Sequence, residues 1–186
     1  MARVEMVNGK AAGAATRLGE LLRTYPKDAL AEDAMFVRGL CLQQAKQPAE
    51  AQKQFADYLR DHPQGKHAAE ARHQAAVCLA AMGKTKDAVS ALLQLAQQKS
   101  TRQDSVLYDL AWAYRSGGDD KHAEETYRSL LAEFPDSAKA RAARLELPEL
   151  LFTGKRYTEA ADLLTAAIAD PALDAHLRSL AKYRLG

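Results

Sequence analysis

Apolar and polar positions alternate with a helical period along almost the whole chain. In residues 31–44, Val37, Leu40 and Cys41 follow the three-to-four-residue spacing of one helix face. A short break with a proline follows, and this proline is well placed to start a second helix over residues 49–60. The same helix–turn–helix pattern is expected three more times, over residues 68–82 and 85–98, 104–116 and 121–133, and 137–153 and 157–169. Nothing in the pattern favours strands.

The helical pairs are copies of one repeating pattern. An alanine recurs near the start of each second helix, at Ala14, Ala51, Ala88, Ala123 and Ala160. Four residues later stands a large apolar side chain, at Leu18, Phe55, Leu92, Tyr127 and Leu164. Twelve residues before three of these alanines stands a small residue, at Gly39, Ala76 and Ala111. Self-similarity at this period predicts a solenoid of stacked units.

These residues resemble the tetratricopeptide repeat (TPR), a helix–turn–helix unit of ~34 residues with small and large residues at set places. The resemblance covers nearly the whole chain and implies an all-α, right-handed superhelical solenoid of antiparallel helix–turn–helix units. About four are complete, and both ends carry partial ones. The expected divisions are 1–27 (partial), 31–65, 68–100, 104–137, 141–171 and 174–186 (truncated).

Two features depart from a regular array. Pro148 stands at the small-residue position of the fourth complete repeat, where proline removes a hydrogen bond and clashes with the carbonyl of Arg144. We therefore expect a kink or a break in that helix, either as a local bend or as a hinge. At the carboxyl end, Leu177, Leu180 and Leu185 are expected to lack a partner helix, which predicts a fragment of a longer array.

The joints between repeats give a second resemblance. The runs at Tyr25-Pro26, His62-Pro63 and Phe134-Pro135 are similar to the aromatic-proline joints of bacterial envelope proteins of the BamD-like and Tol-Pal-associated types. A proline here ends one helix while Asp or Ser caps the next. The resemblance implies a periplasmic setting and leaves a cytoplasmic one open.

Composition narrows the function classes. The formal net charge is +2, and lysine and arginine are spread along the chain. Nucleic-acid binding needs clustered positive charge, so this distribution does not favour it. No apolar run approaches the ~20 residues of a membrane span. Neither a nucleotide-binding loop nor a hydrolase motif is present, so we expect no enzyme and no cofactor. The turn at residues 116–120 reads instead as an interhelical turn with an aspartate cap.

The histidines and cysteines predict no metal site. His67, His73 and Cys78 are separated by six and five residues, so neither pair shares a helix face well. Cys41 and Cys78 occupy equivalent places in adjacent repeats and are expected to lie about one repeat step apart, too far for a disulfide, so small buried thiols are expected.

In the family that this chain resembles, the first helix of each repeat lines a concave groove that binds extended or helical peptides. Carried over position by position, the groove residues are Phe36, Leu40, His73, Val77, Tyr108, Trp112, Arg115, Leu145, Glu149 and Phe152. Aromatic side chains along such a groove would serve as anchors. Alternatively, Phe36, Tyr108 and Trp112 pack as core between neighbouring first helices. The Lys and Asn clamp by which some members hold a C-terminal carboxylate is absent.

The leading hypothesis is a non-catalytic scaffold that binds a protein or peptide partner in this groove, within a bacterial envelope complex. The alternative is a structural module that forms a homo-oligomer through its ends or convex face. An RNA reader would need basic faces and recurring polar pairs, which the sequence lacks. A catalytic role has no constellation of residues to support it.

Overall fold

The computed structural model describes residues 10–98, 102–171 and 173–185, and every regular element within these ranges is an α-helix. The chain forms two compact units, residues 1–100 and residues 101–186, which are described separately below. The expected all-α fold class is confirmed. Within the described ranges, no helix combines the length and the apolar character needed to cross a membrane.

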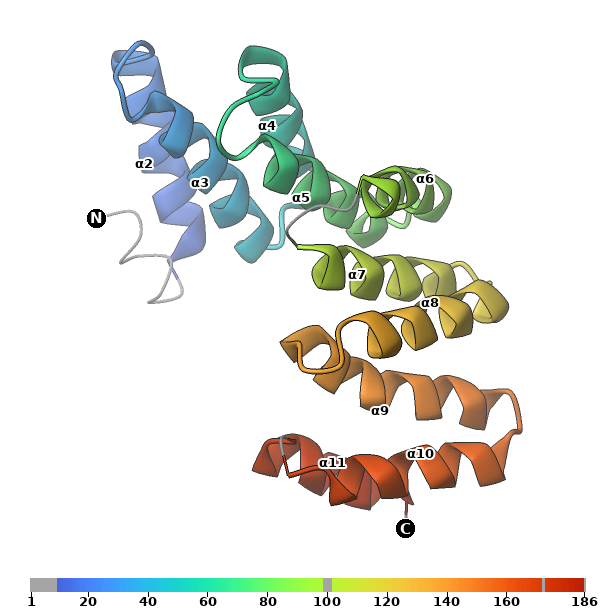
Figure 1. The fold of residues 1–186 in the computed structure, drawn as a ribbon. Helices are drawn as coiled ribbons and strands as arrows, with labels where there is room; N and C mark the ends of the chain where they lie inside the picture. Colours follow the sequence, from blue (N-terminus) through green and yellow to red (C-terminus); the bar gives the residue numbers. More distant parts are fainter. Residues whose placement is uncertain (1–9, 99–101, 172, 186) are drawn as a thin grey trace. The chain divides into compact units, whose positions relative to one another are not determined.

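The first unit consists of helices packed in sequential order (Figure 1). Its helices are α2 (Ala11–Thr24), α3 (Ala31–Gln44), α4 (Pro48–Asp61), α5 (Ala68–Ala81) and α6 (Thr85–Gln97). The pairs α3–α4 and α5–α6 are complete repeats, and the first helices α3 and α5 also contact each other. The partial first helix expected before α2 falls on residues 1–9, outside the described residues.

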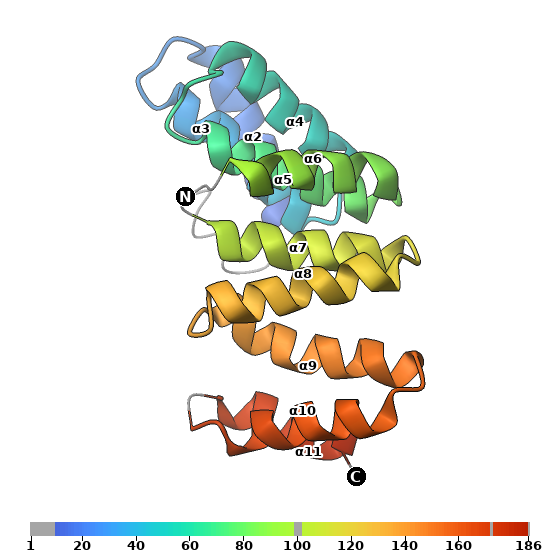
Figure 2. The same ribbon diagram turned by 45° about the vertical axis from the view of Figure 1, so that its right-hand side comes forward.

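The second unit continues the same order (Figure 2). Its helices are α7 (Gln103–Ser116), α8 (Asp120–Glu133), α9 (Ala138–Thr153), α10 (Tyr157–Ala169) and α11 (Ala175–Leu185). The first helices α7, α9 and α11 form a row in which α9 contacts both of the others. That row carries the candidate site described below.

The recurring residues are the centres of packing. The five alanines, from Ala14 to Ala160, are at most 3% exposed, and the large residues four positions later are at most 9% exposed. At Gly39, an added Cβ would lie 2.5 Å from Cε1 of the Phe55 ring. The helices of this repeat therefore approach each other more closely than any side chain at position 39 would allow.

The turns inside the repeats share one backbone conformation. Lys46, Gly83, Gly118 and Lys155 stand five residues before successive alanines, and all have φ between 58° and 77°. Glycine adopts this left-handed region without steric cost, whereas lysine does so at some expense. The position of the turn is thus fixed by the repeat even where the residue is not glycine.

At two helix starts, capping follows the sequence prediction. The Asp119 side chain accepts a hydrogen bond from the His122 backbone N–H at the start of α8. The Ser137 hydroxyl likewise accepts one from the Ala140 N–H, 3.0 Å away, at the start of α9. Each side chain satisfies a backbone donor that the first turn of a helix leaves open.

Two expectations about the second unit need correction. Helix α9 is continuous through Pro148, so the expected break is absent, whereas a kink stays a prediction. Leu177 and Leu180 do not lack partners, because they pack against a buried cluster that contains Leu145, Leu164 and Ala181. Leu185 is 42% exposed.

Within the first unit, polar contacts connect successive repeats. The Tyr58 hydroxyl donates to Glu32 Oε1 at 2.6 Å and accepts from the His67 backbone N–H at 3.0 Å. Burial, together with this bond to Glu32, raises the pKa of Tyr58 to about 12, so the phenol stays protonated and donates. The His67 ring is 2.8 Å from Asp33 and is stacked on Phe36, with ring centroids 4.3 Å apart.

The cysteines behave as expected from their positions. Cys41 and Cys78 are free thiols and almost completely buried. Burial raises the pKa of the Cys78 thiol to about 11, which keeps it in the unreactive neutral form. Both serve as small apolar packing residues.

In the second unit, an ion-pair network connects the second helices α8 and α10. Arg128 lies 2.8 Å from Glu124 and 2.5 Å from Glu159. Arg156 lies 2.6 Å from Glu124 and 2.5 Å from Glu159. Each charge therefore has two opposite partners. Hydrogen bonds from Arg128, which has the larger effect, and from Arg156 lower the pKa of Glu159.

We predict that Gly39→Ala destabilises the protein. The new methyl group would collide with the Phe55 ring, which is fully buried and cannot move aside. The cost of overpacking, about 1–3 kcal/mol, should exceed the gain in helix propensity. Urea unfolding followed by circular dichroism measures the free energy of unfolding.

Gly13→Ala in α2 is the matched control, because no atom lies within 4 Å of the added Cβ. It should stabilise by about 1 kcal/mol, and equal effects of both changes would contradict the packing argument.

The network on α8 and α10 predicts a pH dependence. Because the pKa of folded Glu159 lies below its ordinary value of 4.5, the stability that this carboxylate contributes is present above pH 4.5. It is lost as the pH falls through the lowered pKa. We expect Glu159→Gln to have a lower Tm than the wild type at pH 7 and a similar Tm at low pH. A difference in Tm that is constant with pH would contradict this role.

Candidate functional site

A chain of ion pairs connects the first helices of the second unit. On α7, Arg115 donates to Glu146 Oε2 at 2.9 Å and to Glu149 Oε1 at 3.0 Å, both on α9. On α11, Arg184 lies 2.8 Å from Glu149 Oε2 and also donates to the Leu145 carbonyl oxygen at 2.7 Å. Burial would lower the pKa of Arg115, but Glu149 and Glu146 raise it overall. Glu149 therefore bridges arginines from both neighbouring first helices.

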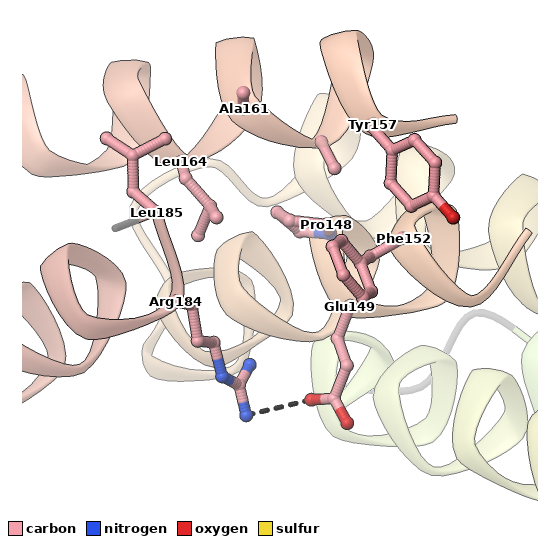
Figure 3. Close-up of a pocket in the computed structure, with 9 residues that line it drawn as sticks. Pro148, Glu149, Phe152, Tyr157, Ala161, Leu164, Arg184 and Leu185 are labelled. Carbon is pink, nitrogen blue, oxygen red and sulfur yellow. Dashed lines mark ion pairs between the residues drawn. The ribbon is translucent and has the colours of Figure 1, made fainter. Parts of the chain in front are cut away.

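Beside this chain lies an open pocket of about 450 Å³, formed by α9, α10 and α11 (Figure 3). We call it the aromatic pocket; its lining residues are Pro148, Glu149, Phe152, Tyr157, Ala160, Ala161, Leu164, Arg184 and Leu185. Its wall is mainly apolar, and the Glu149–Arg184 ion pair lies at one side (Figure 3). The pocket therefore combines apolar surface with a small number of polar groups, as binding sites commonly do.

Two exposed aromatic rings define the entrance of the aromatic pocket. Phe152, near the end of α9, is 60% exposed, and Tyr157, which begins α10, is 53% exposed. The rings meet edge to face with their centroids 5.0 Å apart. Mutual contact orients each ring while leaving much of its surface in water, so binding a partner would remove apolar area at little ordering cost.

Two further aromatic residues lie on α7. Trp112, one turn before Arg115, is 51% exposed. Tyr108 is half-buried, with its ring edge-on to Tyr127 and Lys139 Nζ 4.6 Å from its centroid. Trp112 is thus accessible, whereas Tyr108 is largely engaged within the repeat.

The structure divides the ten predicted groove residues into three groups. Phe36, His73 and Leu145 are at most 5% exposed, so these three side chains are not accessible to a partner in this structure, and Phe36 packs in a buried cluster. Half-buried positions are Leu40, Val77 and Tyr108. Arg115 is also half-buried, with its side chain 23% exposed, whereas Trp112, Glu149 and Phe152 have accessible side chains. These last four residues all belong to the second unit.

Three residues of the aromatic pocket, Tyr157, Arg184 and Leu185, are not among the predicted groove residues. Tyr157 begins a second helix, whereas the predicted residues all lie on first helices. Arg184 and Leu185 are at the end of α11, beyond the four complete repeats that supplied the predicted residues. Pro148 was noticed as an irregularity, but not as a residue of a pocket wall.

The described residues include no group of three histidine, cysteine or acidic side chains placed to hold a metal ion. The ion pairs beside the aromatic pocket join arginine to glutamate. Such groups can orient a bound peptide by hydrogen bonds.

Comparison with known proteins agrees with this architecture. One family model described as tetratricopeptide repeat matches residues 105–137, and another with the same description matches residues 1–66. Together they match more than half of the chain. No curated protein matches it in sequence. Proteins of the matched family are generally non-enzymatic and mediate protein–protein interactions.

Several solved structures share the fold. The TPR-like repeats of a kinesin-light-chain-like protein from Podosopora anserina superpose with a TM-score of 0.75 at 18% identity, covering 90% of each chain. MamA from Desulfovibrio magneticus superposes with a TM-score of 0.73 at 16% identity, covering 90% of this chain and 89% of the MamA chain. A tetratricopeptide repeat protein from Parabacteroides merdae superposes with a TM-score of 0.72 at 18% identity. The match covers 100% of this chain and 71% of that protein's chain.

At these identities the likeness concerns the fold alone. The two matching models agree with the repeated alanine, large apolar and turn positions. The chain therefore contains tetratricopeptide repeats over residues 1–66 and 105–137.

Proposed function

We propose that the protein is a non-catalytic scaffold that binds a peptide or helix of a protein partner on the first-helix face of its second unit. The observation that carries the proposal is the aromatic pocket, whose entrance consists of the exposed rings of Phe152 and Tyr157. An apolar side chain of the partner would pack against these rings and against Leu164, which lines the same pocket. Burial of such an anchor in a pocket is how interfaces concentrate their binding energy.

The ion-pair chain supplies the polar rim of the proposed interface. Glu149 is already oriented by Arg115 and Arg184, and its side chain remains 40% exposed. Its carboxylate could accept from backbone N–H groups of the partner without rearrangement. Trp112, exposed on α7, extends the surface by one first helix. The proposed footprint thus covers α7, α9 and α11 in that order.

We further propose that the scaffold belongs to a bacterial envelope complex. The resemblance of the proline joints at Pro26, Pro63 and Pro135 supports this setting.

The partner surface can be tested with defined peptides. Peptides selected by display on the full chain are synthesised, and their affinities are measured through fluorescence of Trp112, the single tryptophan. We expect the selected peptides to share an apolar anchor. We also expect Phe152→Ala to weaken their binding by about 30-fold or more, as for an interface hot spot.

Leu93→Ala is the matched control, because Leu93 is an exposed apolar residue on α6 in the other unit. It should leave the affinities unchanged. Circular dichroism should show the same helicity for wild type and both variants. Equal binding by the wild type and Phe152→Ala would place the interface elsewhere.

Self-association is the second candidate function, and one observation favours it. On α11, Tyr183 is 84% exposed and Leu185 is 42% exposed, whereas the corresponding Leu145 and Leu147 on α9 are buried. A second copy packing on α11 would cover both side chains. Light scattering at several protein concentrations should then show a mass that rises with concentration and falls again in Tyr183→Ser. A monomer mass at every concentration would exclude this function.

A further inference from the structure

The first unit contains a different kind of pocket, which takes no part in the proposed function. It has a volume of about 630 Å³ and lies between the second helices α2 and α4, across α3. Arg23, Arg38 and Arg60 line it together with Asp57, Asp61 and Gln54. We call it the arginine pocket.

Arg38 is held in place by uncharged partners. Its Nε donates to the Ala15 carbonyl oxygen at 3.2 Å, and its Nη1 donates to Oε1 of Gln54. Gln54 is 5% exposed, so the amide that orients Arg38 is itself fixed in the interior. The guanidinium also lies close to α2 at Gly19, where an added Cβ would be 3.1 Å from Nε. Arg38 is therefore preorganised, but these partners do not neutralise its charge.

The acidic residues of the arginine pocket are already paired with other cations. Arg60 lies 2.8 Å from Asp57 and 2.8 Å from Asp61, and Asp57 is also 2.8 Å from Lys53. In the described part of the chain, neither Arg23 nor Arg38 has an ion pair with a carboxylate. Two arginines of one pocket thus remain without a negative partner.

We propose that the arginine pocket binds the carboxylate of an acidic side chain from a protein partner, through Arg38 and Arg23. A planar guanidinium matches a carboxylate with two parallel hydrogen bonds, and the preorganised Arg38 loses little freedom on binding. A single negative charge suits the site better than a phosphate dianion. Asp57 and Asp61 line the same pocket and would repel a second charge.

The proposal predicts a specific, weak and salt-dependent interaction. The test titrates the full chain with an end-blocked Gly-Glu-Glu-Gly peptide and follows the arginine Nε–H signals by NMR. Saturable shifts of the Arg38 and Arg23 signals are expected with this peptide. The Gly-Gln-Gln-Gly peptide, of the same size without charge, should produce none. Similar shifts with both peptides would overturn the proposal.

Variants separate the site from general charge attraction. Arg23→Gln removes an exposed side chain and should weaken binding by about tenfold, the effect expected for a hydrogen bond to a charged group. Lys86→Gln on α6 removes the same charge in the same unit but outside the pocket, and should leave the affinity unchanged. Equal weakening by both variants would show nonspecific attraction and overturn the proposal.

Two further measurements complete the test. Arg38→Lys keeps the charge but loses the forked donor, and should reduce binding at least as strongly as Arg23→Gln, while circular dichroism verifies its fold. Arg38→Lys binding as tightly as the wild type would contradict the proposed role of the guanidinium. Inorganic phosphate at the same concentration should bind more weakly than the Glu peptide. Tighter binding of phosphate would identify a phosphate site instead.

Discussion

Close approach of two helices within each repeat is the constraint on which the rest of the structure depends. The recurring alanine of the second helix and the large side chain one turn later fill the space that a small residue leaves on the first helix. At Gly39 and Phe55 the fit leaves no room for a methyl group. Because each repeat contacts mainly its neighbours, the fold has no single centre, and its stability is close to a sum of such contacts. Every accessible site therefore lies on surfaces that this packing leaves uncovered.

The packing within each repeat also explains which structural features could be predicted from the sequence. Helix bounds, caps and buried alanines depend on local patterns, and α3 at Ala31–Gln44 agrees with its expected range. Phe36 was assigned to a surface because its position in the repeat usually faces a groove. Its ring packs against Phe55 and Tyr58 of its own repeat and is also stacked on His67, which comes from the following repeat. Spacing within one repeat carries no information about such a contact.

The candidate site was predictable only in part, for a related reason. Arg115, Glu149 and Phe152 were identified from first-helix positions, but the pairing of Arg115 with Glu149 across two helices was not. Tyr157 contributes from the start of a second helix, where family resemblance assigns no ligand contact. The site thus depends on residues that depart from the repeat pattern. A prediction that carries positions over from one repeat to the next does not find such residues.

Pro148 has a mechanical consequence for the aromatic pocket. Proline provides no N–H for the carbonyl of Arg144, so the hydrogen-bond ladder of α9 lacks one rung at this point. The helix nevertheless continues, and Pro148 itself forms part of the pocket wall. A helix bends most easily where its ladder is incomplete. We therefore expect the wall to be the most compliant segment of α9, which would let the pocket adjust its width to anchors of different size while the repeats on either side keep their packing.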